Sequence, residues 1–117
     1  MTIEYRQFTP AEHRRFATAI DRGFGGHYEP GRDLYELDRK SFTPDKSMGA
    51  FDGGEIVGTS GAIAFESAVP GGAIIKNAGV TAVTVATTHR RQGVLTNMMK
   101  RLLKQERAKG QPVASLW

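Results

Sequence analysis

The sequence contains no cysteine, which excludes disulfide bonds, thiolate metal ligands and a cysteine nucleophile. The three histidines, His13, His27 and His89, are far apart and lack the spacing of metal ligands. No apolar run approaches the roughly 18 to 20 residues of a membrane-spanning helix, and the N-terminus lacks the apolar core of a secretory signal. We therefore expect a cytoplasmic protein with no metal site and no membrane partner.

What the chain does have is an ordinary globular composition with an excess of positive charge. Its 117 residues, of which 39% are hydrophobic and 24% charged, suit a single domain. The net charge of +4 is compatible with a polyphosphate ligand, a nucleic acid or an acidic surface. The basic residues do not alternate with aromatic ones, and no RNA- or DNA-binding motif is present. We therefore expect no nucleic-acid partner.

The first third of the chain predicts a strand followed by helices. Ile3–Phe8 alternates apolar and polar residues, as a strand does. A helix is predicted over Pro10–Arg22, because Thr9 suits a helix cap, proline suits the first turn, and Glu12 lies three residues after the cap. A shorter helix is predicted over Arg32–Lys40.

The rest of the chain predicts strands and then one strongly amphipathic helix. Asp52 and two glycines form a hairpin turn signal, and a Val/Thr-rich segment is typical of a buried strand. An earlier piece of this strand is predicted near Ile74-Ile75. The other predicted elements are strands over Ser47–Phe51, Glu55–Glu66 and Gly79–Ala86, a helix from Val94 to Gly110, and a strand over Pro112–Trp117.

The most informative segment is the loop Thr87–Gly93, which joins the Val/Thr-rich strand to the amphipathic helix. A helix N-terminus offers unpaired backbone N–H groups and the positive end of the helix dipole, which suit a pyrophosphate. Gly93 allows close approach of a ligand, and Arg90 and Arg91 add bidentate donors. The Walker and dinucleotide glycine patterns are absent. The residues alone predict an anion site, with a solvated basic loop as the alternative.

The segment Val83–Leu95 resembles the acetyl-CoA motif of GNAT N-acetyltransferases, Gln/Arg-x-x-Gly-x-Gly/Ala after the fourth strand. It is most similar to the enhanced-intracellular-survival (Eis) type, which reads Val-x-Val-x-Pro-Thr-His-Arg-Arg-Arg-Gly-Leu-Leu. Thr87 replaces the usual proline, and Leu95 fills the place of a small residue, as it does in the Eis type. Other counterparts, from about Ser47 onward, are Ala50–Gly53, Val57–Thr59, Val69–Gly72 and Ala78–Val80.

This resemblance implies an α/β (α+β) GNAT fold, a mixed and mostly antiparallel sheet flanked by helices, with acetyl-CoA as the cofactor. The residues that it assigns to acetyl-CoA are Val83 and Val85 for the pantetheine arm, Arg90, Arg91 and Gly93 for the pyrophosphate, and Gln92, Val94 and Leu95 for nearby backbone N–H groups. The implied activity is acetyl transfer to a primary amine of an aminoglycoside, a polyamine or lysine, by direct attack in a ternary complex. A non-catalytic acyl-CoA-binding sensor or scaffold is the alternative.

The resemblance assigns no catalytic residue. In the Eis type, a tyrosine further along the chain and the C-terminal carboxylate of a third domain act as acid and base, and neither has a counterpart here. We therefore expect residues 1–117 to be a single N-terminal GNAT acetyl-CoA-binding domain, truncated at the start of the fifth strand and C-terminally incomplete. Because Eis-type enzymes form hexamers, the resemblance is compatible with a homo-oligomer.

Three further hypotheses concern side chains outside the motif. Phe24, Tyr28 and Tyr35 are candidates for an acceptor pocket, with ordinary packing as the alternative. Glu66 is a candidate catalytic carboxylate, although its neighbours match no such motif. His89 is expected to be a structural loop residue, since the spacing indicates no partner carboxylate for it.

Overall fold

Five strands form one mixed sheet in the part of the chain that the computed structural model describes, residues 2–26 and 43–116. In sheet order, which is also chain order, they are β1 (Glu4–Arg6), β2 (Gly49–Asp52), β3 (Glu55–Ala68), β4 (Ile74–Val85) and β5 (Val113–Leu116). Strands β1 to β4 pair antiparallel, whereas β4 and β5 pair parallel. The predicted mixed, mostly antiparallel sheet is confirmed.

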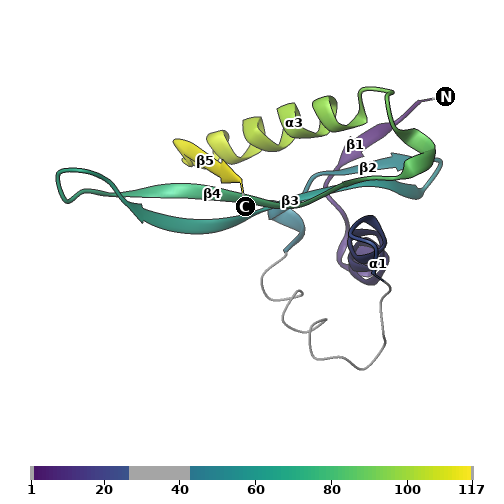
Figure 1. Cartoon of the computed structure of the whole chain (residues 1–117), viewed down its shortest axis with the longest axis horizontal. Coiled ribbons are helices and arrows are strands. Elements are labelled where there is room, and N and C mark those ends of the chain that lie inside the picture. The colour runs from purple at the N-terminus through teal and green to yellow at the C-terminus, as the bar shows by residue number, and fades with distance from the viewer. Residues whose placement is uncertain (1, 27–42, 117) are drawn as a thin grey trace.

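The described helices lie on opposite faces of this sheet (Figure 1). They are α1 (His13–Gly23) and α3 (Val94–Ala108), with single 3-10 turns at Pro10–Glu12, Pro44–Lys46 and Thr87–His89. On the α3 face, Val94, Met98 and Leu102 are buried, because their spacing of four residues places them on one side of the helix. The buried side chains on the α1 face are Phe8, Phe16 and Phe51. No helix within the described ranges is long and apolar enough to cross a membrane.

Several predicted boundaries shift. The first strand is confined to Glu4–Arg6, and the helix predicted from Pro10 starts as a 3-10 turn, so its α-helical part begins at His13. The earlier strand piece predicted near Ile74-Ile75 is confirmed as strand, but it is continuous with the strand predicted from Gly79, because β4 pairs with β3 without interruption from Ile74 to Thr81. The helix predicted over Arg32–Lys40 lies outside the described residues.

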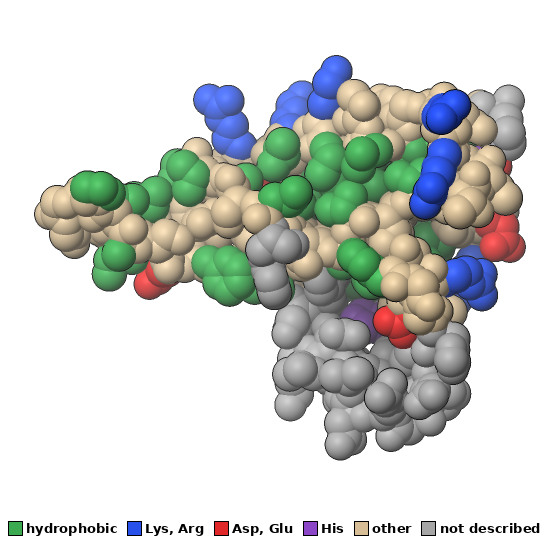
Figure 2. Space-filling view, viewed as in Figure 1, with side chains coloured by type: hydrophobic (Ala, Val, Ile, Leu, Met, Phe, Trp, Pro, Cys, Tyr) green, Lys and Arg blue, Asp and Glu red, His purple; other side chains and the backbone are tan. Residues whose placement is uncertain are grey.

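Beyond the helices, the outer parts of β3 and β4 form a long two-stranded arm (Figure 1). Apolar side chains lie exposed along the arm and on β5, including Phe65, Ile74 and Leu116 (Figure 2). Glu66 is exposed on this arm, in register with Lys76. Glu66, the candidate catalytic carboxylate, therefore projects from the arm rather than from the end of β4 that precedes α3.

The end of β4 that leads to α3 is separated from the arm by a β-bulge. Between the pairs Thr59↔Thr84 and Gly61↔Thr81, two residues of β4 oppose one of β3, and Ala82 has a φ of 54°. Strand β5 pairs only with Asn77–Val80, before the bulge. The outer edge of β4 beyond Val80 therefore has no strand partner among the described residues, so its backbone groups are open to a ligand.

Candidate functional site

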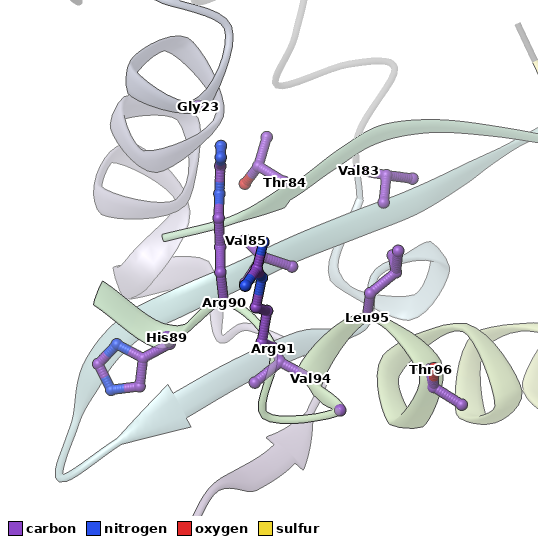
Figure 3. Close-up of a pocket in the computed structure, with 11 residues that line it drawn as sticks. Gly23, Val83, Thr84, Val85, His89, Arg90, Arg91, Val94, Leu95 and Thr96 are labelled. Atoms are coloured by element: carbon purple, nitrogen blue, oxygen red, sulfur yellow. The ribbon is translucent and has the colours of Figure 1, made fainter. Parts of the chain in front are cut away.

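An open cleft of about 480 Å³, called the α3 cleft here, lies where β4 meets the loop before α3 (Figure 3). Its lining residues are Gly23, Val83, Thr84, Val85, His89, Arg90, Arg91, Gly93, Val94, Leu95 and Thr96. The cleft brings together all of the residues that the sequence assigned to acetyl-CoA except Gln92. Sequence reasoning missed three lining residues, Gly23, Thr84 and Thr96. Gly23 reaches the cleft only because α1 ends against β4. No Asp or Glu is among the described residues that line this cleft.

The start of α3 supplies backbone donors to the α3 cleft. Gly93 is the N-cap residue with a φ of 77°, a left-handed conformation that glycine adopts without steric cost. The side-chain amide of Asn97 donates a hydrogen bond of 2.9 Å to the Gly93 carbonyl, which stabilises the first turn of α3. The N–H groups of the first helical residues have no partner within the helix, so they are available to an anion.

Arg90 and Arg91 supply the positive charge. Both side chains are exposed, and neither forms an ion pair or hydrogen bond with the described residues. Arg90 extends from the loop toward the end of α1, where Gly23 lies (Figure 3). Arg91 has a φ of 63°, which is unfavourable for a residue with a side chain and is found most often at functional sites. The cleft therefore holds two uncompensated guanidinium groups beside a helix N-terminus.

His89 anchors the loop to the turn between β2 and β3. Its Nε2 lies 2.8 Å from the carboxylate of Asp52, and its Nδ1 lies 2.7 Å from the Thr88 hydroxyl. Because a carboxylate only accepts, Nε2 donates to Asp52, and the Thr88 hydroxyl is the partner of Nδ1. The expectation that His89 has no carboxylate partner was wrong, because the partner lies 37 residues away and only the sheet brings it close. Its role in the loop structure is confirmed.

A buried pair of threonines supports the β-bulge. The Thr59 hydroxyl donates to the Ala82 carbonyl over 2.8 Å, and the hydroxyls of Thr59 and Thr84 lie 2.6 Å apart. Gly23 packs against the other side of Thr84, so closely that a Cβ on Gly23 would lie 2.4 Å from Cγ2 of Thr84. The end of α1 is therefore fitted to β4 directly beside the bulge.

The other sequence hypotheses find less support in the described residues. Phe24 is 69% exposed and does not line the α3 cleft, while Tyr28 and Tyr35 lie outside the described ranges. Within those ranges, no group of three or more His, Asp or Glu side chains is placed to hold a metal ion.

A mixed sheet with a helix on each face and a cationic cleft at a strand–helix junction defines an α/β domain suited to an anionic ligand. A profile of the acetyltransferase (GNAT) domain matches residues 4–117, and the chain belongs to this family. The fold and family implied by the motif around Arg90 are thereby confirmed.

Relatives agree with this assignment. An uncharacterized N-acetyltransferase of Streptomyces coelicolor is 46% identical over 120 residues, which cover 99% of this chain and 29% of that protein. N-acetyltransferase Eis of Mycobacterium bovis is 41% identical over 68 residues, 58% of this chain and 17% of that protein. The crystal structure of Eis1 from Mycobacterium abscessus matches with a TM-score of 0.80 at 30% identity, covering 97% of this chain and 27% of that one. The predicted similarity to the Eis type is confirmed, and the chain spans less than a third of these relatives' length.

Proposed function

We propose that this domain binds acetyl-CoA in the α3 cleft and serves an N-acetyltransferase that acetylates a primary amine. One observation carries the proposal: the open edge of β4, the N-terminus of α3 and two unpaired arginines meet in a single cleft. The backbones of Val83 and Val85 would pair with the pantetheine arm. Arg90, Arg91 and the first turn of α3 would bind the pyrophosphate.

The reaction we propose is direct attack of a neutral amine on the thioester carbon within a ternary complex. A C–N bond forms as the C–S bond breaks, the nitrogen loses a proton, and the sulfur leaves as a thiolate that is then protonated. The cofactor supplies the activated acetyl group, and the chain's own residues hold and orient it. Aminoglycosides, polyamines and lysine side chains all offer a suitable amine.

Among the described residues, no free general base lines the α3 cleft. His89 is the imidazole among the described lining residues, and hydrogen bonds to Asp52 and Thr88 occupy both of its ring nitrogens. We propose that groups outside these lining residues transfer the proton, and that residues 1–117 are the N-terminal cofactor-binding domain of a longer acetyltransferase.

The first test is isothermal titration of the chain with acetyl-CoA, comparing the native sequence with the double variant Arg90→Glu, Arg91→Glu. Each lost hydrogen bond to a charged group is worth about 1.5–3 kcal/mol, so the variant should bind at least about 100-fold more weakly. The matched control is Lys100→Glu, Lys104→Glu, which makes the same charge change on exposed positions further along α3.

Native-like binding by the control, with loss in the arginine variant, supports the proposed site. Equal losses in the two variants would mean that net charge alone attracts the cofactor. Release of free CoA by the full-length protein in the presence of an amine would then separate an acetyltransferase from a non-catalytic sensor, which binds without turnover.

A further inference from the structure

A second cleft, called the α1 cleft here, lies between the end of α1 and the end of β4. Its volume is about 280 Å³, enough for a phosphate group and several waters, since a water occupies about 30 Å³ in the liquid. Its lining residues are Ala19, Arg22, Gly23, Ile56, Val57, Gly58, Thr84, Val85, Ala86, Thr87, Thr88 and Arg90. The α1 cleft adjoins the α3 cleft, because Gly23, Thr84, Val85 and Arg90 line both.

The described part of the α1 cleft carries positive charge. Among its described lining residues, the charged ones are Arg22, in the last turn of α1, and Arg90, from the loop, and both are exposed. Arg22, like Arg90, makes no ion pair or hydrogen bond with the described residues. Two like charges around one small cleft repel each other, and an anion placed between them relieves that repulsion. Thr87 and Thr88 line the same cleft.

The positive charge of the α1 cleft indicates which kind of ligand it would bind. An acceptor amine is cationic in water until it loses its proton, so two guanidinium groups disfavour it here. A phosphate monoester suits them, since a guanidinium binds phosphate oxygens in a bidentate manner. CoA carries three phosphates. Two form its pyrophosphate, which we propose binds in the α3 cleft, and the third is on the ribose 3′ oxygen.

We propose that the α1 cleft binds the ribose 3′-phosphate of CoA, with Arg22 as the residue that recognises it and Arg90 shared between the 3′-phosphate and the pyrophosphate. This inference rests on the proposed function, because it presumes that CoA occupies the α3 cleft. It assigns to α1 a part in cofactor recognition that lies outside the loop motif, and it makes the domain selective for CoA over 3′-dephospho-CoA.

The test is titration of the native chain and of Arg22→Gln with CoA and with 3′-dephospho-CoA. The native chain should bind CoA at least about tenfold more tightly, as loss of one charge-assisted phosphate contact implies. In Arg22→Gln, CoA affinity should fall about tenfold while affinity for 3′-dephospho-CoA stays unchanged, so the selectivity nearly disappears. Arg22→Lys should restore part of it.

Two controls make the result specific. Arg91→Gln should weaken both ligands by the same factor, because Arg91 lines the α3 cleft and not the α1 cleft. Lys104→Gln, on an exposed face of α3, should change neither. Since Arg22 is exposed, the thermal unfolding midpoint of Arg22→Gln should match that of the native chain, which excludes misfolding as the cause.

The outcomes separate this inference from the proposed function. Equal native affinity for CoA and 3′-dephospho-CoA, or undiminished selectivity in Arg22→Gln, would overturn the role of the α1 cleft and leave acetyl-CoA binding intact. Failure of the folded native chain to bind either ligand would instead overturn the proposed function itself.

Discussion

His89 and Asp52 show how single residues position the loop before α3. Their side chains are largely shielded, 14% and 24% exposed, and their contact ties the loop to the turn between β2 and β3. We predict that Asp52→Ala raises the dissociation constant of acetyl-CoA several-fold and lowers the free energy of unfolding by about 1 kcal/mol, the usual worth of one hydrogen bond. Titration calorimetry and urea unfolding measure the two effects.

Asp52→Asn tests whether the loss in Asp52→Ala comes from the missing hydrogen-bond acceptor. Its amide oxygen can still accept from Nε2 of His89, so this variant should recover most of the affinity that Asp52→Ala loses. If Asp52→Ala binds acetyl-CoA as tightly as the native chain, the position of the loop does not depend on this contact.

At the scale of elements, the end of α1 is fitted to β4 through Gly23 and Thr84. Adding a Cβ to Gly23 places it 2.4 Å from Cγ2 of Thr84, whose hydroxyl is already held by Thr59. Overpacking of this kind costs about 1–3 kcal/mol, against a gain of about 1 kcal/mol in helix propensity. We predict that Gly23→Ala lowers the free energy of unfolding by up to about 2 kcal/mol, measured in urea.

Gly26→Ala is the matched control, because its nearest neighbour would be 3.5 Å away, an ordinary contact. It should change the free energy of unfolding by less than about 0.5 kcal/mol. Equal effects of the two substitutions would show that α1 can shift freely relative to β4. Because Gly23 lines both clefts, such freedom would also weaken the case for a preformed cofactor site.

At the scale of the whole molecule, one ion pair joins the first strand, the start of α1 and the sheet. Arg6 contacts both carboxylate oxygens of Glu12, at 2.8 and 3.0 Å, and its guanidinium lies 3.8 Å from the ring centre of Phe51. Hydrogen bonding to Arg6 is the main cause that lowers the pKa of Glu12 from 4.5 to about 2. A lowered pKa in the folded state stabilises the fold above pH 4.5, and this contribution is lost as the pH falls toward 2.

We therefore predict that Glu12→Gln lowers the free energy of unfolding by about 1–2 kcal/mol at neutral pH, a value reduced from the full linkage energy because the pair is partly solvated. The difference between this variant and the native chain should shrink between pH 4.5 and 2. Glu4→Gln is the control, since the Glu4 side chain is 67% exposed and meets Arg6 only at 3.3 Å. Urea unfolding across this pH range checks both, and a constant difference would contradict the linkage.

Elements whose sequence signal lies within a few neighbouring residues could be predicted well. Spacing of four residues among Val94, Met98 and Leu102 predicted α3, and the junction of strand, basic loop and helix predicted the cleft around Arg90. The same reasoning did not join the strand piece near Ile74 to the strand from Gly79, because pairing with β3 continues β4 through residues such as Asn77 that have a weak local preference for strands.

The sequence by itself determined the family and the basic loop before α3, because both depend on side chains that are consecutive in the chain. Only the tertiary structure decided which distant groups face that loop: Asp52 opposite His89, Thr59 at the bulge, and Arg22 beside Arg90. The physical reason is that strand register and the packing of α1 against β4 set these distances. Register arises from hydrogen bonds and burial summed over the whole sheet, which no local window of sequence contains.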